Sequence, residues 1–212
     1  MLQVHSFTFS PIQENTYIIY NQHRNAILID PGCYFTAEQE TLQSFLSVND
    51  LKLTQIINTH CHLDHVFGNK WAAATFGLEV FIHPEEEKML AFAPQSGVKY
   101  GLPFDNYTGA LQFLKQGDVV FLDEDELLIL ETPGHSPGSI SLYCKADNFV
   151  IVGDALFYLS IGRTDLPFAN HQQLLNSIRL QLFTLPETTK VYSGHGKPTI
   201  IGYEQRNNPY LK

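Results

Sequence analysis

One short segment constrains this chain more than any other. Residues 59–65 read THCHLDH and follow LTQIIN, a run of residues typical of a buried strand. In an extended segment, side chains two residues apart point to the same side, so His60 and His62 can reach one metal ion together. Asp64 and His65 are adjacent and diverge, so at least one of them can serve a second ion. Imidazole and carboxylate ligands suit zinc, and also iron or manganese.

Three further polar residues also follow strand-like runs. His135 lies in TPGHSPGS, where prolines and glycines predict a turn from which the imidazole protrudes. Asp154 ends IVGD, and a carboxylate after a β-branched run is costly unless it is paired or bound to metal. His195 lies between two glycines in YSGHGKP, and these glycines allow the backbone to come close to a ligand. Each residue is weak evidence alone, but all of them together predict a metal centre assembled from distant parts of the chain.

The first half of the chain reads as strands separated by helices. Three short strands are predicted before residue 31, and a helix is expected to begin at Thr36, with Gln39 placed for a capping box. The segment HCHLDHV, residues 60–66, is expected to be a loop. A helix over residues 69–76 follows, with Gly77 as its stop signal. A short helix that opens at Pro84 completes the first half.

The second half repeats this order, and VVFL, LLILETP, SISLYC and NFVIVGD read as strands. Residues 171–185 are expected to form a helix with Asn170 as its N-cap. Strands followed by helices in each half predict packed sheets with helices outside. Because no linker or internal repeat is evident, we expect a single domain over residues 1–212.

Residues 93–110 differ in character from the rest. They contain two prolines, three glycines and the aromatic residues Tyr100, Phe104 and Tyr107. A structureless segment longer than about 12 to 15 residues is usually functional or disordered. We interpret this segment as a flap near the site, with a plain surface insertion as the alternative.

Composition excludes several classes of function. A formal net charge of −9 and the absence of a basic run argue against a nucleic-acid partner. The cysteines, Cys33, Cys61 and Cys144, are odd in number and show no disulfide framework. The N-terminal residues do not resemble a signal peptide, and no run is long enough to span a membrane. We therefore expect a cytoplasmic protein without a membrane partner.

From AILIDPG to SGHG, the order of these motifs resembles the metallo-β-lactamase superfamily, and within it the glyoxalase II (hydroxyacylglutathione hydrolase) branch. The resemblance implies an α/β fold, a four-layer αβ/βα sandwich in which two mixed β-sheets pack face to face with helices outside. It also implies two divalent metal ions, expected to be zinc with iron or manganese as alternatives. By the same resemblance Asp154 would bridge the two ions, and Asp30 would orient the metal-binding loop. The remaining ligands would be His60, His62 and His135 for the first ion, and Asp64, His65 and His195 for the second.

The resemblance further implies hydrolysis of a thioester by a metal-bridged hydroxide. The expected partner is a small-molecule thioester, an S-hydroxyacyl thiol such as S-lactoylglutathione. Asp64 would also orient the hydroxide and so count as the catalytic side chain. Only 17 residues follow His195, too few for the helical C-terminal region that helps full-length glyoxalase II enzymes to bind glutathione. The chain instead resembles the shorter glyoxalase II-like hydrolases, including their SIGRTDLP segment.

Several alternatives stay open from the sequence. The GRTD stretch also occurs in the persulfide dioxygenases of the superfamily, which use one iron ion, so a mononuclear iron dioxygenase is the alternative activity. Arg163 could anchor a substrate carboxylate or form a salt bridge with Asp165. Cys61 is expected to point away from the metal and serve packing. The four histidines outside these motifs are expected to be ordinary surface or strand-end residues: His5, His23, His83 and His171.

Overall fold

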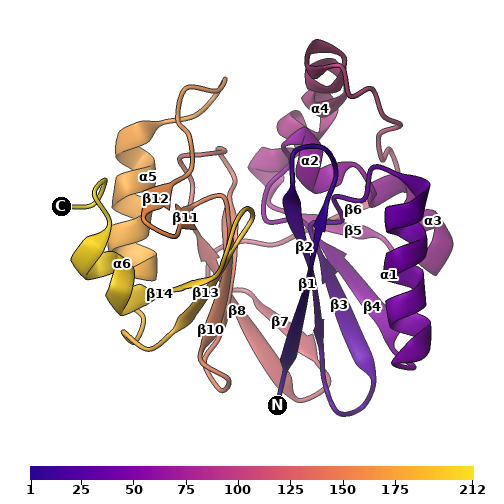
Figure 1. Cartoon of the computed structure of the whole chain (residues 1–212), viewed down its shortest axis with the longest axis horizontal. Coiled ribbons are helices and arrows are strands. Elements are labelled where there is room, and N and C mark those ends of the chain that lie inside the picture. Colours follow the sequence, from indigo (N-terminus) through magenta and orange to yellow (C-terminus); the bar gives the residue numbers. More distant parts are fainter.

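Two mixed sheets of six strands each form the centre of the computed structural model, which describes residues 1–212 (Figure 1). The first sheet has the strand order β1-β2-β3-β4-β5-β6, with antiparallel pairing from β1 to β3 and parallel pairing from β3 to β6. Its strands are β1 Gln3–Phe9, β2 Glu14–Tyr20, β3 Asn25–Ile29, β4 Lys52–Ile57, β5 Val80–Ile82 and β6 Leu111–Phe113.

The second sheet has the order β14-β13-β10-β9-β8-β7, and only β10 and β13 are parallel in it. A two-stranded ribbon, β11 Leu156–Phe157 with β12 Ser160–Ile161, follows β10. The strands of the second sheet are β7 Val119–Leu122, β8 Asp125–Glu131, β9 Ile140–Cys144, β10 Phe149–Gly153, β13 Lys190–Ser193 and β14 Thr199–Ile200.

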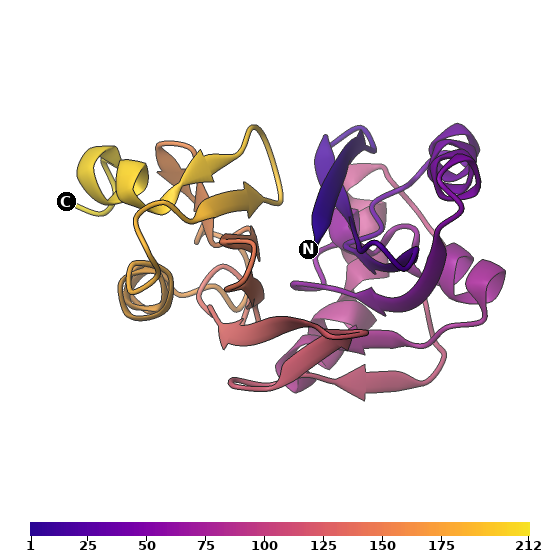
Figure 2. The same cartoon turned by 90° about the horizontal axis from the view of Figure 1, so that it is seen from below.

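Helices lie on the outer sides of the two sheets (Figures 1 and 2). Helices α1 and α3 flank the first sheet, α5 and α6 flank the second, and α2 and α4 lie at the upper end of Figure 1. None of these helices has both the length and the apolar character needed to cross a membrane. Their bounds are α1 Thr36–Val48, α2 Leu63–Val66, α3 Asn69–Phe76, α4 Glu87–Tyr100, α5 His171–Ser177 and α6 Ile201–Asn207, with a 3-10 turn η1 Pro84–Glu86 and a π turn η2 Ile178–Leu182.

Strand alternation divides the core into three apolar layers. In β3, Ala26 and Leu28 pack toward the outer helices, whereas Ile27 and Ile29 pack between the two sheets. Burying one such isoleucine fully stabilises the fold by about 1.5–3 kcal/mol. A third layer joins the second sheet to α5 and η2 through Leu174 and other residues. The layers run helix, sheet, sheet, helix, which confirms the predicted sandwich.

Helix α4 corrects the prediction for residues 93–110. Residues 93–100 are helical rather than loop, and only the part from Gly101 onward is irregular before β6. Pro94 lies inside the helix and cannot donate a hydrogen bond to the carbonyl of Leu90. The side-chain amide of Asn106 donates to that carbonyl instead, at 2.8 Å. A contact from outside the helix therefore offsets the proline, and the local sequence does not reveal it.

Smaller differences from the sequence predictions concern helix ends. The carboxylate of Glu38, not Gln39, accepts hydrogen bonds from the backbone at the start of α1. Residues 63–66 form the single turn α2 within the expected loop. Gly77 ends α3 and Asn170 caps α5, both as predicted. The helix expected over residues 171–185 is divided into α5 and the π turn η2.

Candidate metal centre

All seven predicted ligands follow strands and meet where the two sheets open toward α2 and α4. His60 and His62 follow β4, and α2 carries Asp64 and His65. His135 lies in the loop between β8 and β9. Asp154 directly follows β10, and His195 lies two residues beyond β13. Because β10 and β13 are parallel neighbours, their carboxyl ends lie at the same edge of the sheet.

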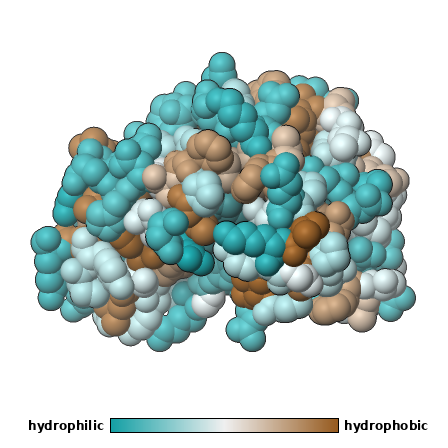
Figure 3. All heavy atoms as spheres, turned by 90° about the horizontal axis from the view of Figure 1, so that it is seen from above, coloured by the Kyte–Doolittle hydropathy of each residue, from teal (hydrophilic) through white to brown (hydrophobic).

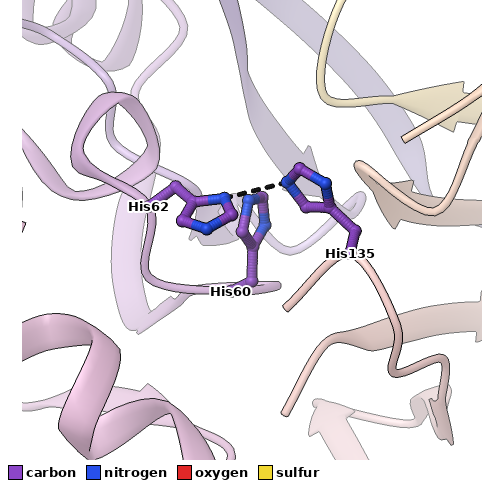
Figure 4. Close-up of side chains that lie close together, drawn as sticks. All are labelled: His60, His62 and His135. Carbon is purple, nitrogen blue, oxygen red and sulfur yellow. Dashed lines mark hydrogen bonds between the residues drawn. The ribbon is translucent and has the colours of Figure 1, made fainter. Parts of the chain in front are cut away.

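Three histidines form the first set, which we call the three-histidine group: His60, His62 and His135. One ring nitrogen from each lies within 4.8 Å of the others. Nδ1 of His62 and Nε2 of His135 are 2.8 Å apart, and the three rings converge (Figure 4). This spacing of three nitrogen donors suits one divalent cation.

A second set, which we call the Asp64 group, consists of Asp64, His65 and His195. Their ligand atoms also lie within 4.8 Å of one another. Nε2 of His195 is 3.1 Å from Oδ2 of Asp64, and Nε2 of His65 is 3.9 Å from the same oxygen. One oxygen and two nitrogen donors again suit a divalent cation.

Asp154 lies between the two groups. Its Oδ2 is 3.4 Å from Nε2 of His135 in the first group and 3.6 Å from Nε2 of His195 in the second. Its Oδ1 is 3.5 Å from Nε2 of His65. A carboxylate in this position can contribute an oxygen to both sets of ligands.

In four of the five histidines, Nδ1 lies within hydrogen-bonding distance of an oxygen acceptor outside the two groups. Nδ1 of His60 is 3.2 Å from Oγ1 of Thr59, and Nδ1 of His135 is 2.8 Å from the carbonyl of Arg163. Nδ1 of His195 is 3.1 Å from the carbonyl oxygen of Gln13. Such contacts select the tautomer that leaves Nε2 free to bind a cation.

Asp30 provides the corresponding acceptor for His65. Its Oδ2 lies 2.9 Å from Nδ1 of His65 and accepts a hydrogen bond from Oγ1 of Thr59, and its Oδ1 accepts one from the backbone N–H of Thr59. Asp30, His60 and His65 are also close enough together to be considered as ligands. Both oxygens of Asp30 are already engaged, however, so Asp30 orients the loop rather than facing a cation.

Unpartnered buried atoms indicate that the cluster fits divalent cations. Nε2 of His60, Nε2 of His65 and Oδ1 of Asp154 are buried without a hydrogen-bond partner. A buried polar atom left without a partner costs about 1–3 kcal/mol. All three atoms belong to the cluster, and bound cations would satisfy them. The donor set of imidazole and carboxylate groups is the one that zinc, iron and manganese prefer.

The histidines differ in the direction of their pKa shifts. Burial, with the neighbouring His65, holds the pKa of His60 well below its usual value, and burial with His135 lowers that of His62 to about 3. Burial also lowers the pKa of His65, but Asp30, Asp64 and Asp154 outweigh it, so that the net pKa is well above the usual value. Burial would raise the pKa of Asp154, but the adjacent His65 and other histidines hold it well below the usual value. The carboxylate of Asp154 is therefore ionised.

A cavity of about 760 Å³ opens onto the cluster. Its apolar wall includes Met89 and Phe92 of α4 and Phe157 of β11. Figure 3 shows that hydrophobic surface at this end of the molecule is interspersed with hydrophilic surface. Gln95, Ser96, Lys99 and Tyr100 of α4 line the cavity, so the prediction that residues 93–110 lie near the site is confirmed for the helical part alone, whereas residues 101–110 do not line the cavity.

Two positively charged side chains, Arg163 and Lys99, line the cavity, and they differ in their partners. Arg163 forms a two-point ion pair with Asp165, with both N–O distances 2.7 Å, and both side chains are exposed. This confirms the salt-bridge interpretation of Arg163. Lys99 also lines the cavity, and its Nζ lies 5.8 Å from the centre of the Tyr100 ring without an ion pair to any acid. Lys99 is therefore a positive charge beside the candidate metal centre that no acid of the chain neutralises.

The other predictions for histidine and cysteine can be compared with their surroundings. Cys61 is fully buried in the apolar layer between the first sheet and its helices, as expected. The four remaining histidines lie outside both groups and contact other partners, namely His5 on Phe45, His23 on Glu124, His83 on Glu131 and His171 on Thr164.

Sequence reasoning missed two buried acids beside the cluster. Glu14 is fully buried, with Oε1 3.9 Å from Nδ1 of His65. Glu86 is fully buried and contacts the loops that carry His62 and His135. Glu14 opens β2, and Glu86 is the middle residue of an EEE run that reads as a solvated helix start. No local signal in the sequence distinguishes either residue from an exposed glutamate.

The sequence of this chain is similar to those of one protein family. The model of the family described as Metallo-beta-lactamase superfamily matches residues 10–195. Hydroxyacylglutathione hydrolase GloC of Haemophilus influenzae is 36% identical over 201 residues, covering 94% of this chain and 93% of the relative. The probable metallo-hydrolase YqgX of Bacillus subtilis is also 36% identical, with 95% and 93% covered.

Solved structures share the fold over nearly the whole chain. BLEG-1 B3 metallo-beta-lactamase is 35% identical with a TM-score of 0.91, and 99% of this chain and 100% of that chain are covered. TTHA1623 in a di-iron-bound form is 33% identical with a TM-score of 0.89, with 98% and 100% covered. ETHE1 from Myxococcus xanthus is 29% identical with a TM-score of 0.79, with 98% and 83% covered.

Proposed function

Because the chain belongs to the metallo-beta-lactamase superfamily of metallo-hydrolases, we propose that it hydrolyses thioesters, with an S-hydroxyacyl thiol such as S-lactoylglutathione as its substrate. One observation carries the proposal: two groups of ligand atoms lie side by side, and Asp154 contacts both of them. The similarity to a hydroxyacylglutathione hydrolase along almost its full length supports the choice of a thioester.

In this proposal the three-histidine group would hold one cation, the Asp64 group would hold the other, and Asp154 would contribute its carboxylate to both. The preferred ion is zinc because neutral imidazole and carboxylate are its usual ligands in catalytic sites. Iron is the main competitor because the same donors bind it and because a similar structure is in a di-iron-bound form.

Bound cations would supply an activated water and polarise the substrate carbonyl. In the net reaction, the water oxygen bonds to the acyl carbon as the carbon–sulfur bond breaks. One water proton ends on the thiol sulfur, and the products are a carboxylic acid and a thiol. Burial would raise the pKa of Asp64, but His65 and His195 lower it overall, so Asp64 is ionised. Its carboxylate lines the cavity and can orient the attacking water by accepting a hydrogen bond.

The cavity walls suggest how a substrate would lie. The apolar side chains of Met89, Phe92 and Phe157 provide a wall against which the carbon chain of a thioester can pack. Lys99 would attract a negatively charged group on the substrate, since no acid of the chain neutralises it. Arg163 is less available, because Asp165 already engages its guanidinium group.

A direct test measures hydrolysis of S-lactoylglutathione by the purified protein before and after removal of metal with a chelator. We expect activity to disappear with the metal and to return when zinc is added. Metal content is measured on the same sample, so that loss of activity can be compared with loss of ions. Undiminished hydrolysis by metal-free protein would refute the proposal.

Two other activities are measured in parallel. Oxygen uptake with glutathione persulfide tests the mononuclear iron dioxygenase, and one iron per chain together with such uptake would replace the thioesterase proposal. A β-lactam substrate is included because a similar structure is that of a B3 metallo-beta-lactamase. Preferential turnover of the β-lactam would likewise reassign the substrate class.

A further inference from the structure

Glu86 is a fully buried acid at the junction of η1 and α4. Its Oε2 accepts a hydrogen bond from the backbone N–H of Cys61 at 2.7 Å. Its Oε1 accepts one from Oγ of Ser136 at 2.5 Å and another from the backbone N–H of Gly138 at 2.7 Å. Three donors to one buried carboxylate make a strong, directional set of contacts.

The partners of Glu86 belong to both sheets. Cys61 lies between His60 and His62 in the loop after β4 of the first sheet. Ser136 directly follows His135 in the loop between β8 and β9 of the second sheet. The carboxylate therefore ties together the two loops that supply every member of the three-histidine group. One backbone bond, from N–H of Ile140 to the carbonyl of Thr59 at 2.9 Å, also joins these segments, but nearer the strand ends.

The Asp64 group has a different set of supports. His65 is oriented by Asp30, and His195 by the carbonyl of Gln13. None of these contacts involves Glu86. Asp30 and Thr59 reach His60 as well as His65, so the two groups share these contacts, whereas the hydrogen bonds of Glu86 go only to the loops of the three-histidine group.

Packing around Glu86 leaves little freedom for this arrangement to shift. A Cβ atom added at Gly138 would lie 2.6 Å from Nδ1 of His83 and 3.0 Å from Cγ of Glu86. The loop after His135 therefore approaches the start of α4 as closely as a glycine allows.

We infer that Glu86 is a positioning residue that sets the spacing of His60, His62 and His135 and so selectively determines the metal affinity of the three-histidine group. The inference rests on the proposed metal centre. Loss of one carboxylate oxygen as an acceptor would let the two loops separate or rotate, and the three nitrogens would no longer converge on one point. The Asp64 group would keep its contacts with Asp30 and Gln13, and therefore its affinity.

The experiment isolates each group by removing a ligand from the other. His195→Ala retains the three-histidine group, and His135→Ala retains the Asp64 group. Zinc affinity is measured by competition with a chelator in each background, with and without Glu86→Gln. Glu87→Gln, a substitution of the exposed neighbour, is the matched control. We expect Glu86→Gln to weaken zinc binding about 10- to 100-fold in the His195→Ala background, and to change it less than about twofold in the His135→Ala background.

A general structural role would give a different result. Equal weakening in both backgrounds, or no change in the His195→Ala background, would overturn the inference. If Glu86→Gln does not fold, Ser136→Ala replaces it, because that variant removes one of the three hydrogen bonds and keeps the carboxylate. A smaller loss confined to the three-histidine group is then expected, and an unchanged affinity overturns the inference. Failure of the unsubstituted chain to bind zinc would instead refute the metal centre itself.

Discussion

Nδ1 of His65 lies 2.9 Å from Oδ2 of Asp30, and both side chains are buried. This contact directs Nε2 of His65 toward Asp154, at 3.5 Å. Because Asp30 also binds the backbone and hydroxyl of Thr59, it connects the strand end of β3 to the loop after β4. An acid that does not line the cavity thus determines which nitrogen of His65 faces the candidate metal centre.

Asp30→Asn is expected to weaken zinc binding by the Asp64 group about 10- to 100-fold. The amide would accept from the backbone of Thr59 and present its NH₂ to Nδ1 of His65. That arrangement places the imidazole proton on Nε2, the nitrogen needed for the cation. Competition titration with a chelator measures the effect. Asp50→Asn, at an exposed position, is the control, and equal affinities for the two variants would contradict the prediction.

Asp154→Ala is expected to lower metal content to one ion or fewer per chain. Asp154 contacts His65, His135 and His195, so its removal takes an oxygen donor and a negative charge from both groups at once. Elemental analysis of the purified variant tests this. Asp165→Ala serves as a comparison, because Asp165 lines the same cavity but lies in an exposed ion pair. Two ions per chain in Asp154→Ala would exclude a bridging role.

Gly194→Ala is expected to disrupt the metal centre by steric conflict. A Cβ atom there would lie 2.2 Å from Oδ1 of Asp154 and 2.7 Å from Cε1 of His65. Gly196→Ala provides the contrast, because nothing lies within 4 Å of the added atom although φ is +73°. We expect Gly196→Ala to cost about 1 kcal/mol of stability and to keep its metal, whereas Gly194→Ala loses metal. Metal analysis combined with thermal unfolding separates the two effects.

Zinc binding by the two groups is expected to depend differently on pH. Burial lowers the pKa of His195, but its hydrogen bond to Asp64 and the charge of Asp154 raise the net value, and the pKa of His65 is also raised. These protons must leave before a cation binds the Asp64 group. Burial keeps His60 and His62 neutral at pH 7, with lowered pKa values.

Raising the pH from 6 to 8 should therefore tighten zinc binding by the Asp64 group more than by the three-histidine group. The proton is bound below the raised pKa, and its competition with the cation fades as the pH rises through that value. Calorimetric titrations in buffers of different ionisation enthalpy count the protons released. Equal proton release by the two groups would count against this prediction.

Lys99→Ala is expected to lower kcat/KM about two- to fivefold for an anionic thioester such as S-lactoylglutathione. A loss of this size corresponds to the free energy of one exposed ion pair. The corresponding thioester of uncharged N-acetylcysteamine should be hydrolysed at an unchanged rate. Both rates are measured at low and high salt, since screening should remove the difference. Lys115→Ala, at an exposed position outside the cavity lining, is the control. An equal loss for both substrates would show that Lys99 does not recognise charge.

Local patterns identified the candidate ligands, and the order of the motifs along the chain, through its resemblance to a family, assigned them to one metal centre. His60 and His62 share one side of an extended segment, and Asp154 and His195 follow strand-like runs, so the sequence predicted where each would be placed. The carboxyl ends of parallel strands meet at one edge, and the observed edge of β10 and β13 obeys this rule.

Other features depended on contacts between residues far apart in the chain. Pro94 reads as a helix breaker, but Asn106 supplies the hydrogen bond that the proline cannot make, so α4 continues to Tyr100. Glu86 cannot be distinguished from Glu85 by its sequence neighbours. Only folding brings Glu86 next to the loops of both sheets. The sequence by itself therefore determined which residues could bind a cation, because local backbone geometry governs which way they point. The tertiary structure alone decided which acids would orient them, because burial and hydrogen-bond partners arise only when distant segments pack together.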